Sequence, residues 1–278
     1  MVDTTRVFVV LDPTSMEQPS LVWGEKIALD MKQQRQLTVQ LHVYCCIDPT
    51  EGTSPAAAAD DQGDAIKPMS EWMERIVMHT RALGIPVETE VETDPEWRQA
   101  IVNAAKRVNA DTVIKNLTQH SRLVRLVRET ADWQLLRDCH CPVLLVKAGK
   151  EYGIKNILVA VKHTHDETYQ NANTSLLDAA KRLADDLGAN IHAVTCYQAN
   201  EHPDRQRFAD SCGLDRNQVT AAMGTPEKVI ASVAEEQKAD LVVIARVARR
   251  ESAGMLGDTA RKVIDEIATD VLVLPMAT

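Results

Sequence analysis

The chain alternates short continuous apolar runs with longer segments in which apolar positions recur at helical spacing. Residues 6–11 form an apolar run that ends at Asp12-Pro13, which is typical of a strand buried on both faces. Residues 21–37 are rich in helix formers, and residues 38–44 alternate between apolar and polar positions as a second strand does. A helix between two such strands predicts a parallel crossover connection.

The same alternation continues through the rest of the first half. Helices are expected where apolar residues return at every third or fourth position between capping residues, and strands where short apolar runs stand alone. The expected elements are a helix that ends at Gly84, a strand at 87–91, a helix after Asp94-Pro95, a strand at 112–115, a helix at 129–138 and a strand at 143–147.

Two stretches about 130 residues apart read as copies of one another. The two stretches are residues 94–114 and residues 225–244. Each has Pro-Glu at its second and third positions, continues through an amphipathic segment, and reaches Ala-Asp just before an apolar run. A repeat of this length is a whole domain. We therefore expect two tandem doubly wound α/β domains with parallel sheets, at residues 1–149 and 153–278.

Composition limits the class of protein. The 278 residues are 45% hydrophobic and carry a net charge of -9, which gives no reason to expect a nucleic-acid partner. No apolar run approaches the roughly 20 residues needed to cross a bilayer, so no transmembrane segment is expected. Residues 1–11 lack the basic start and the long apolar stretch of a secretory signal, so we expect a cytoplasmic protein.

The six cysteines are expected to be reduced thiols, because adjacent or near-adjacent cysteines are poorly placed to join distant segments. Cys139-His140-Cys141 offers three side chains of metal-binding type. No second pair at zinc-finger spacing accompanies them, and structural residues are therefore the favoured reading. The sequence thus predicts neither a disulfide nor a metal site.

Ligands of doubly wound folds lie beyond the carboxyl ends of the strands, where the strand order reverses. In the second half, the loop that follows the fourth strand leads to the expected start of a helix, where main-chain N–H groups can receive a phosphate and an arginine can add a charge-assisted contact. In the alternative reading, Gly257-Asp258 is simply a turn and a helix cap. The candidate nucleotide-binding residues are Lys162, Ala245, Ala248, Arg249, Gly257, Asp258 and Thr259.

The first half has a different loop after its fourth strand, in which basic and apolar residues interleave. A segment of this kind suits an anionic amphiphile, a membrane surface or a protein partner. In the alternative reading, its leucines pack on the sheet and its arginines are solvated. The candidate residues for an anionic ligand in this half are Asp12, Lys115, Arg122 and Arg125.

Three blocks of sequence carry a family resemblance. They are Val9-Val10-Leu11-Asp12-Pro13 with Gln18-Pro19-Ser20-Leu21, the stretch from Asp132-Trp133 to Cys141-Pro142-Val143, and Leu256-Gly257-Asp258-Thr259-Ala260 with Val263-Ile264-Asp265. Together these blocks resemble the universal stress protein family over nearly the whole chain. The block that contains Trp133 is specific to the tandem two-domain members of that family.

The resemblance implies a nucleotide site whose parts are divided between the two halves. ATP-binding members share a loop of the form G-x2-G-x9-G-[ST] and an acidic residue after the first strand. The first half keeps Asp12 but has no glycine in its fourth-strand loop. The second half keeps Gly257, but Ala245 and Ala248 stand in place of the first two glycines, and Lys162 replaces the acid. An alanine there restricts positive φ and close approach of the backbone.

We therefore expect a non-catalytic stress-response protein that senses a ligand or binds a protein partner. ATP is the candidate cofactor, in the second domain only, and no recognised catalytic motif such as G-x4-G-K-[ST] occurs. Two alternatives stay open, namely an ATP-binding protein with weak ATPase activity in domain 2 and an interaction scaffold without a ligand. Family dimers often join through their fifth strands, which implies an internal pairing of residues 143–146 with 271–274. A homodimer of the whole chain also stays open.

Overall fold

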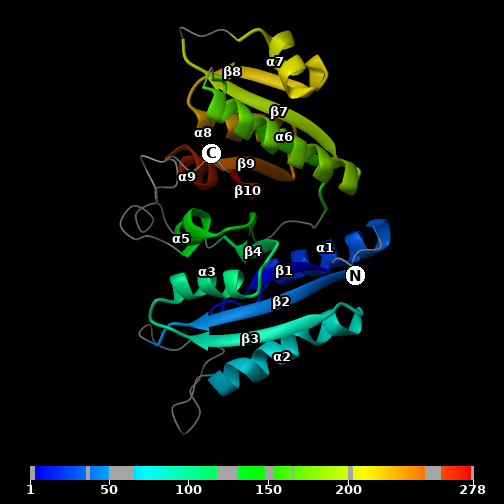
Figure 1. The fold of residues 1–278 in the computed structure, drawn as a ribbon, viewed down its shortest axis with the longest axis vertical. Coiled ribbons are helices and arrows are strands. Elements are labelled where there is room, and N and C mark those ends of the chain that lie inside the picture. The colour runs from blue at the N-terminus through cyan, green and yellow to red at the C-terminus, as the bar shows by residue number, and fades with distance from the viewer. Residues whose placement is uncertain are drawn as a thin grey trace. The chain divides into compact units, whose positions relative to one another are not determined.

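The computed structural model describes residues 4–35, 38–49, 66–117, 131–147, 153–164, 166–199, 203–247 and 258–276. The chain divides into two compact units, unit 1 at Met1–Lys150 and unit 2 at Glu151–Thr278 (Figure 1). None of the helices in these described ranges is both long and apolar enough to span a bilayer.

Unit 1 is a parallel sheet whose strands are joined by helices. Its order across the sheet is β3-β2-β1-β4-β5, and each neighbouring pair is parallel. The chain builds outward from β1 in one direction and then returns to build outward from β1 in the other, so the strand order reverses between β1 and β4. The elements are β1 (Thr4–Val10), α1 (Pro19–Arg35), β2 (Thr38–Ile47), α2 (Ile66–Ala82), β3 (Val87–Thr93), α3 (Trp97–Arg107), β4 (Thr112–Asn116), α5 (Ala131–Asp138) and β5 (Val143–Val146).

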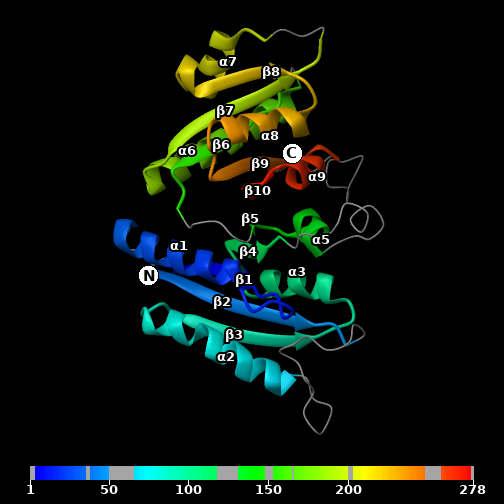
Figure 2. The same ribbon diagram turned by 180° about the vertical axis from the view of Figure 1, so that it is seen from behind.

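Unit 2 repeats this topology with the order β8-β7-β6-β9-β10, again with parallel neighbours. Helices cover both faces of its sheet, because α6 lies in front of the strands in Figure 1 and α8 lies in front of them in Figure 2, seen from behind. The elements are β6 (Asn156–Ala160), α6 (Glu167–Leu187), β7 (Asn190–Tyr197), α7 (Arg205–Cys212), a 3-10 turn (Arg216–Gln218), β8 (Val219–Met223), α8 (Pro226–Glu236), β9 (Leu241–Val247), α9 (Asp258–Glu266) and β10 (Asp270–Met276).

The predicted doubly wound α/β class is confirmed. The predicted pairing of the two fifth strands stays a prediction. The continuous apolar run at the start of the chain forms the centre of the unit 1 sheet, where the side chain of Phe8 is completely buried. Its ring stacks on that of His42, with centroids 5.5 Å apart, and lies 5.2 Å from the ring of Tyr44. Strand β1 thereby joins the neighbouring strand β2 through side chains as well as main-chain hydrogen bonds.

The repeated Ala-Asp segments have the same backbone in both units. Asn109 and Lys238, which follow α3 and α8, have φ angles of 50° and 49° and are the two non-glycine residues with positive φ in the described ranges. The aspartate two residues later then accepts a hydrogen bond from the main chain near the start of the first strand of its unit. Asp111 accepts from the Arg6 N–H at 2.8 Å, and Asp240 accepts from the Asn156 N–H at 2.9 Å. The sequence repeat is therefore a repeated connection between a helix and the amino edge of the sheet.

Candidate functional site

The carboxyl ends of β1 and β4 in unit 1, and of β6 and β9 in unit 2, lie where the strand order reverses. Among the predicted site residues, Asp12 and Lys162 follow the first strands, while Lys115 and Ala245 lie on the fourth strands. Asp258 and Thr259 are the first residues of α9, so their main chain forms its N-terminus. The remaining predicted site residues lie outside the described ranges, and they are Arg122, Arg125, Ala248, Arg249 and Gly257.

The Asp12 carboxylate is engaged by its own loop. Its Oδ1 atom accepts hydrogen bonds from the backbone N–H of Thr14 at 2.8 Å and from the Thr14 hydroxyl at 2.6 Å. An aspartate that bonds the main chain two residues ahead forms an Asx-turn, which stabilises a tight bend in the chain. One oxygen of Asp12 therefore shapes the loop after β1.

The main chain at each first-strand exit is held by the amide of a side chain, an arrangement that we call the amide clamp. In unit 1 the Gln18 amide accepts from the Asp12 N–H at 3.0 Å and donates to the Asp12 carbonyl at 2.7 Å. In unit 2 the Asn173 amide accepts from the Lys162 N–H at 3.2 Å and donates to the Lys162 carbonyl at 2.8 Å. Both clamps fix backbone atoms only, so the side chains of Asp12 and Lys162 take no part in them.

Replacing Gln18 with alanine is expected to lower the free energy of unfolding by about 1–3 kcal/mol, because the half-buried main-chain N–H and carbonyl of Asp12 would lose their partners. Chemical denaturation followed by tryptophan fluorescence measures this change. All four tryptophans of the chain lie in unit 1, at positions 23, 72, 97 and 133. The neighbouring exposed Glu17, replaced by alanine, is the control and should change stability by less than about 0.5 kcal/mol. Equal effects of the two variants would contradict the clamp.

The start of α1 is tied to the ends of two strands. Asn116, the last residue of β4, accepts a hydrogen bond from the Ser20 N–H at 2.7 Å through its Oδ1 atom. The Ser20 hydroxyl donates to the carbonyl of Val10 in β1 at 2.9 Å. A first-turn N–H of a helix is a common partner for an anionic ligand. In unit 1 the N–H of Ser20 bonds to a protein amide instead.

Lys115 forms a buried ion pair with Asp132 of α5. Its Nζ atom lies 2.8 Å from Asp132 Oδ1, and the two side chains are only 10% and 5% exposed. The ammonium also donates to the main-chain carbonyl of Asn116 at 3.1 Å. The positive charge that the sequence offered to an anionic ligand is thus neutralised by a carboxylate inside the protein.

The corresponding edge of unit 2 presents an exposed cation. Lys162 Nζ lies 3.4 Å from the centroid of the Tyr169 ring in the first turn of α6. Lys162 is exposed and Tyr169 is half-buried. A cation over an aromatic face is stabilised by about 0.5–1 kcal/mol at an exposed site. The Tyr169 ring therefore orients the Lys162 ammonium without removing it from water. Ala245 lies on the neighbouring strand β9, where it is half-buried and in register with Leu274 of β10.

Sequence reasoning missed the partners of these lysines. Asp132 had a usable signal, since a lysine expected in a buried strand needs a carboxylate, and Asp132 is one of two acids in the tryptophan-containing block. Tyr169 and Asn173 had almost none. Each lies in a helix with several polar neighbours, and nothing in the sequence distinguishes the side chain that turns back toward Lys162.

Comparison with known proteins gives the same family over most of the chain. The family model described as "Universal stress protein family" matches residues 4–147 and 198–275. The universal stress protein E homolog of Haemophilus influenzae is 28% identical, with 96% of each chain covered. Universal stress protein E of Escherichia coli is also 28% identical and covers 96% of this chain and 93% of its own. A solved structure of a functionally unknown protein from Pseudomonas aeruginosa PAO1 covers 97% of this chain and 92% of its own, with a TM-score of 0.75 and 23% identity.

Proposed function

Because the chain belongs to the universal stress protein family, we propose that it is a non-catalytic stress-response protein that senses an anionic ligand at the carboxyl edge of the unit 2 sheet. The observation that carries this proposal is the contrast between two lysines. Lys115 in unit 1 is buried against Asp132, whereas Lys162 in unit 2 is exposed over Tyr169. An exposed, oriented ammonium is able to contact an anion from solution.

The neighbourhood of Lys162 favours a phosphate-bearing ligand. Strands β6 and β9 are paired and parallel, so Lys162 after β6 lies at the same edge of the sheet as the carboxyl end of β9. A helix N-terminus offers main-chain N–H groups and a positive dipole end to an anion, and α9 begins at Asp258. We name an adenine nucleotide as the candidate ligand. We expect it to bind weakly, because Ala245 carries a β-carbon where the ATP-binding members have glycine.

Unit 1 has a different role in this proposal. Two of its candidate residues are engaged within the unit, Asp12 with Thr14 and Lys115 with Asp132. We assign unit 1 to structural support and to binding of a protein partner. An anionic amphiphile at the basic segment that contains Arg122 and Arg125 remains the alternative for this unit. For the protein as a whole, we propose a cytoplasmic location.

Isothermal titration with ATP and Mg²⁺ tests the proposal. Replacing Lys162 with glutamine is expected to weaken binding about five-fold, because an exposed charge contact contributes up to about 1 kcal/mol. Higher ionic strength should reduce the difference between wild type and variant, since salt screens exposed charges. The control is Lys155→Gln, which removes an exposed lysine just before β6, at the opposite edge of the same sheet.

Three other results would contradict the proposal. Absence of heat for any adenine nucleotide would favour the scaffold without a ligand. Steady release of phosphate from ATP, lost in the Lys162 variant, would favour the weak ATPase. Equal weakening by Lys155→Gln and Lys162→Gln would mean that the effect comes from net charge and not from a site.

A further inference from the structure

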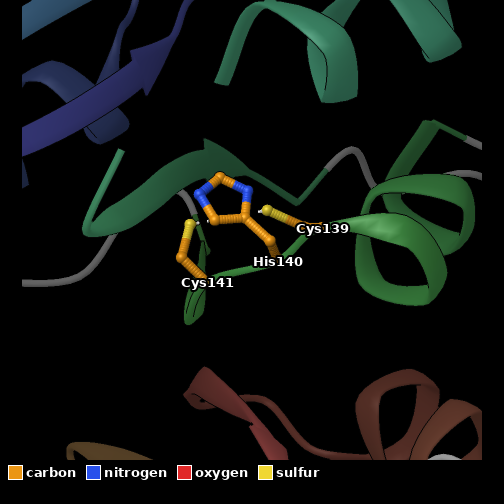
Figure 3. Close-up of side chains that lie close together, drawn as sticks. All are labelled: Cys139, His140 and Cys141. Atoms are coloured by element: carbon orange, nitrogen blue, oxygen red, sulfur yellow. Dashed lines mark hydrogen bonds between the residues drawn. The ribbon is translucent and has the colours of Figure 1, made fainter. Parts of the chain in front are cut away.

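Two buried thiols and one exposed imidazole lie together in the turn that joins α5 to β5. The N–H of Cys139 donates to the carbonyl of Leu135 at 2.9 Å, which continues the helical pattern of α5 to that residue. Cys141 lies two residues before β5 begins at Val143. The ligand atoms of Cys139, His140 and Cys141 all lie within 4.8 Å of one another, and Figure 3 shows the three side chains gathered on one side of the turn.

The distance between the two sulfur atoms suits a shared metal ion. The Sγ atoms of Cys139 and Cys141 are 3.6 Å apart. Two sulfurs at that separation, each about 2.3 Å from one ion, would subtend an angle of about 103° at it, which is close to tetrahedral. The turn therefore already holds the two sulfur atoms at a separation that fits one shared ion. A side-chain rotation of His140 would bring its imidazole to the same ion as a third donor.

From this arrangement we propose that Cys139, His140 and Cys141 bind one thiophilic metal ion, Zn²⁺ or Cu⁺, at the amino edge of the unit 1 sheet. Sulfur and imidazole donors select these ions over Mg²⁺ and Ca²⁺, which prefer oxygen. Cys139 and Cys141 are 1% and 6% exposed, whereas His140 is exposed. The sulfurs are thus shielded, while the imidazole side gives the ion a path from solution. The site is at the edge opposite to the carboxyl ends of β1 and β4.

Metal binding must displace protons from the sulfurs. The hydrogen bond with Cys139, together with burial, raises the pKa of the Cys141 thiol. The Cys141 thiol is therefore protonated at neutral pH before metal binds, and its coordination as a thiolate releases that proton.

The experiment uses the full-length chain, reduced and kept without oxygen, with Zn²⁺ alone in one series and Cu⁺ alone in another. Competition with a chromophoric chelator is expected to give one bound ion per chain. Cys139→Ser and Cys141→Ser should each weaken binding at least about 100-fold, since loss of a thiolate donor exceeds the effect of outer-shell changes. His140→Ala should weaken binding less, by about 10-fold, because both thiolates remain. The controls are Cys212→Ser, a buried cysteine of α7, and His79→Ala, an exposed histidine of α2, and both should bind as wild type does.

X-ray absorption of the loaded wild type keeps the test valid if the serine variants fail to fold. Two sulfur scatterers at about 2.3 Å from zinc are expected. A chain that binds neither ion, an affinity unchanged in all three variants, or one sulfur or none around the ion would overturn the proposal. The proposal would also be overturned if the reduced protein bound neither ion and formed a Cys139–Cys141 disulfide on mild oxidation. The 3.6 Å contact between the sulfur atoms would then be that of a redox-active thiol pair.

Discussion

Replacing Lys115 with methionine is expected to destabilise unit 1 by about 3–5 kcal/mol, because it leaves the carboxylate of Asp132 buried without its cation. Methionine keeps most of the volume of the lysine side chain, so the lost charge and not a cavity dominates the effect. Denaturation with guanidinium chloride, followed by tryptophan fluorescence, measures the loss, since all the tryptophans lie in unit 1.

The double variant Lys115→Met/Asp132→Leu separates an ion pair from simple sensitivity of the position. Removing both charges removes the uncompensated group, so the double variant should recover most of the stability and could equal wild type. Asp132→Leu alone should be destabilising, because it leaves the Lys115 ammonium buried. If the double variant were as unstable as the sum of the two single variants, the pair would not be coupled.

Phe8→Ala is expected to cost about 3–5 kcal/mol of unit 1 stability, since it opens a cavity at a completely buried position in the central strand. The loss also removes the stacking on His42 and the contact with Tyr44, and aromatic pairs contribute about 0.5–1.5 kcal/mol beyond their buried area. The same fluorescence-detected denaturation reports the change.

Phe8→Leu is the matched control for that cavity. It keeps an apolar side chain at the site and is expected to cost no more than about half as much as Phe8→Ala. A cost for Phe8→Ala below about 1 kcal/mol would mean that β1 is not the centre of the core, contrary to its place between β2 and β4.

The strands and the repeat were predictable from the sequence because they depend on local patterns. The apolar run before Asp12 can be buried on both faces only in a central strand, and the structure places it there. The repeated Ala-Asp segments predicted two equivalent halves. The positive φ of Asn109 and Lys238 was not visible, because asparagine tolerates that conformation but lysine gives no such hint.

The candidate site was predicted less well because its contacts join residues far apart in the chain. Strand boundaries were enough to place Asp12 and Lys162 at strand exits. The pairing of Lys115 with Asp132 depends on how α5 packs, and the distance between the sulfurs of Cys139 and Cys141 depends on the turn between α5 and β5. Neither arrangement follows from spacing alone, which had favoured Lys115 as a contact for an anionic ligand and the two cysteines as structural residues.

The amide clamp has a consequence for how the two units can differ at an equivalent position. Gln18 and Asn173 hold the main chain at the strand exit, and they leave the identity of the residue there unconstrained. A change between acid and base at that position can therefore occur without moving the scaffold. Asp12 in unit 1 and Lys162 in unit 2 therefore place opposite charges on the same main-chain frame, and each unit can favour a ligand of different charge without a change of fold.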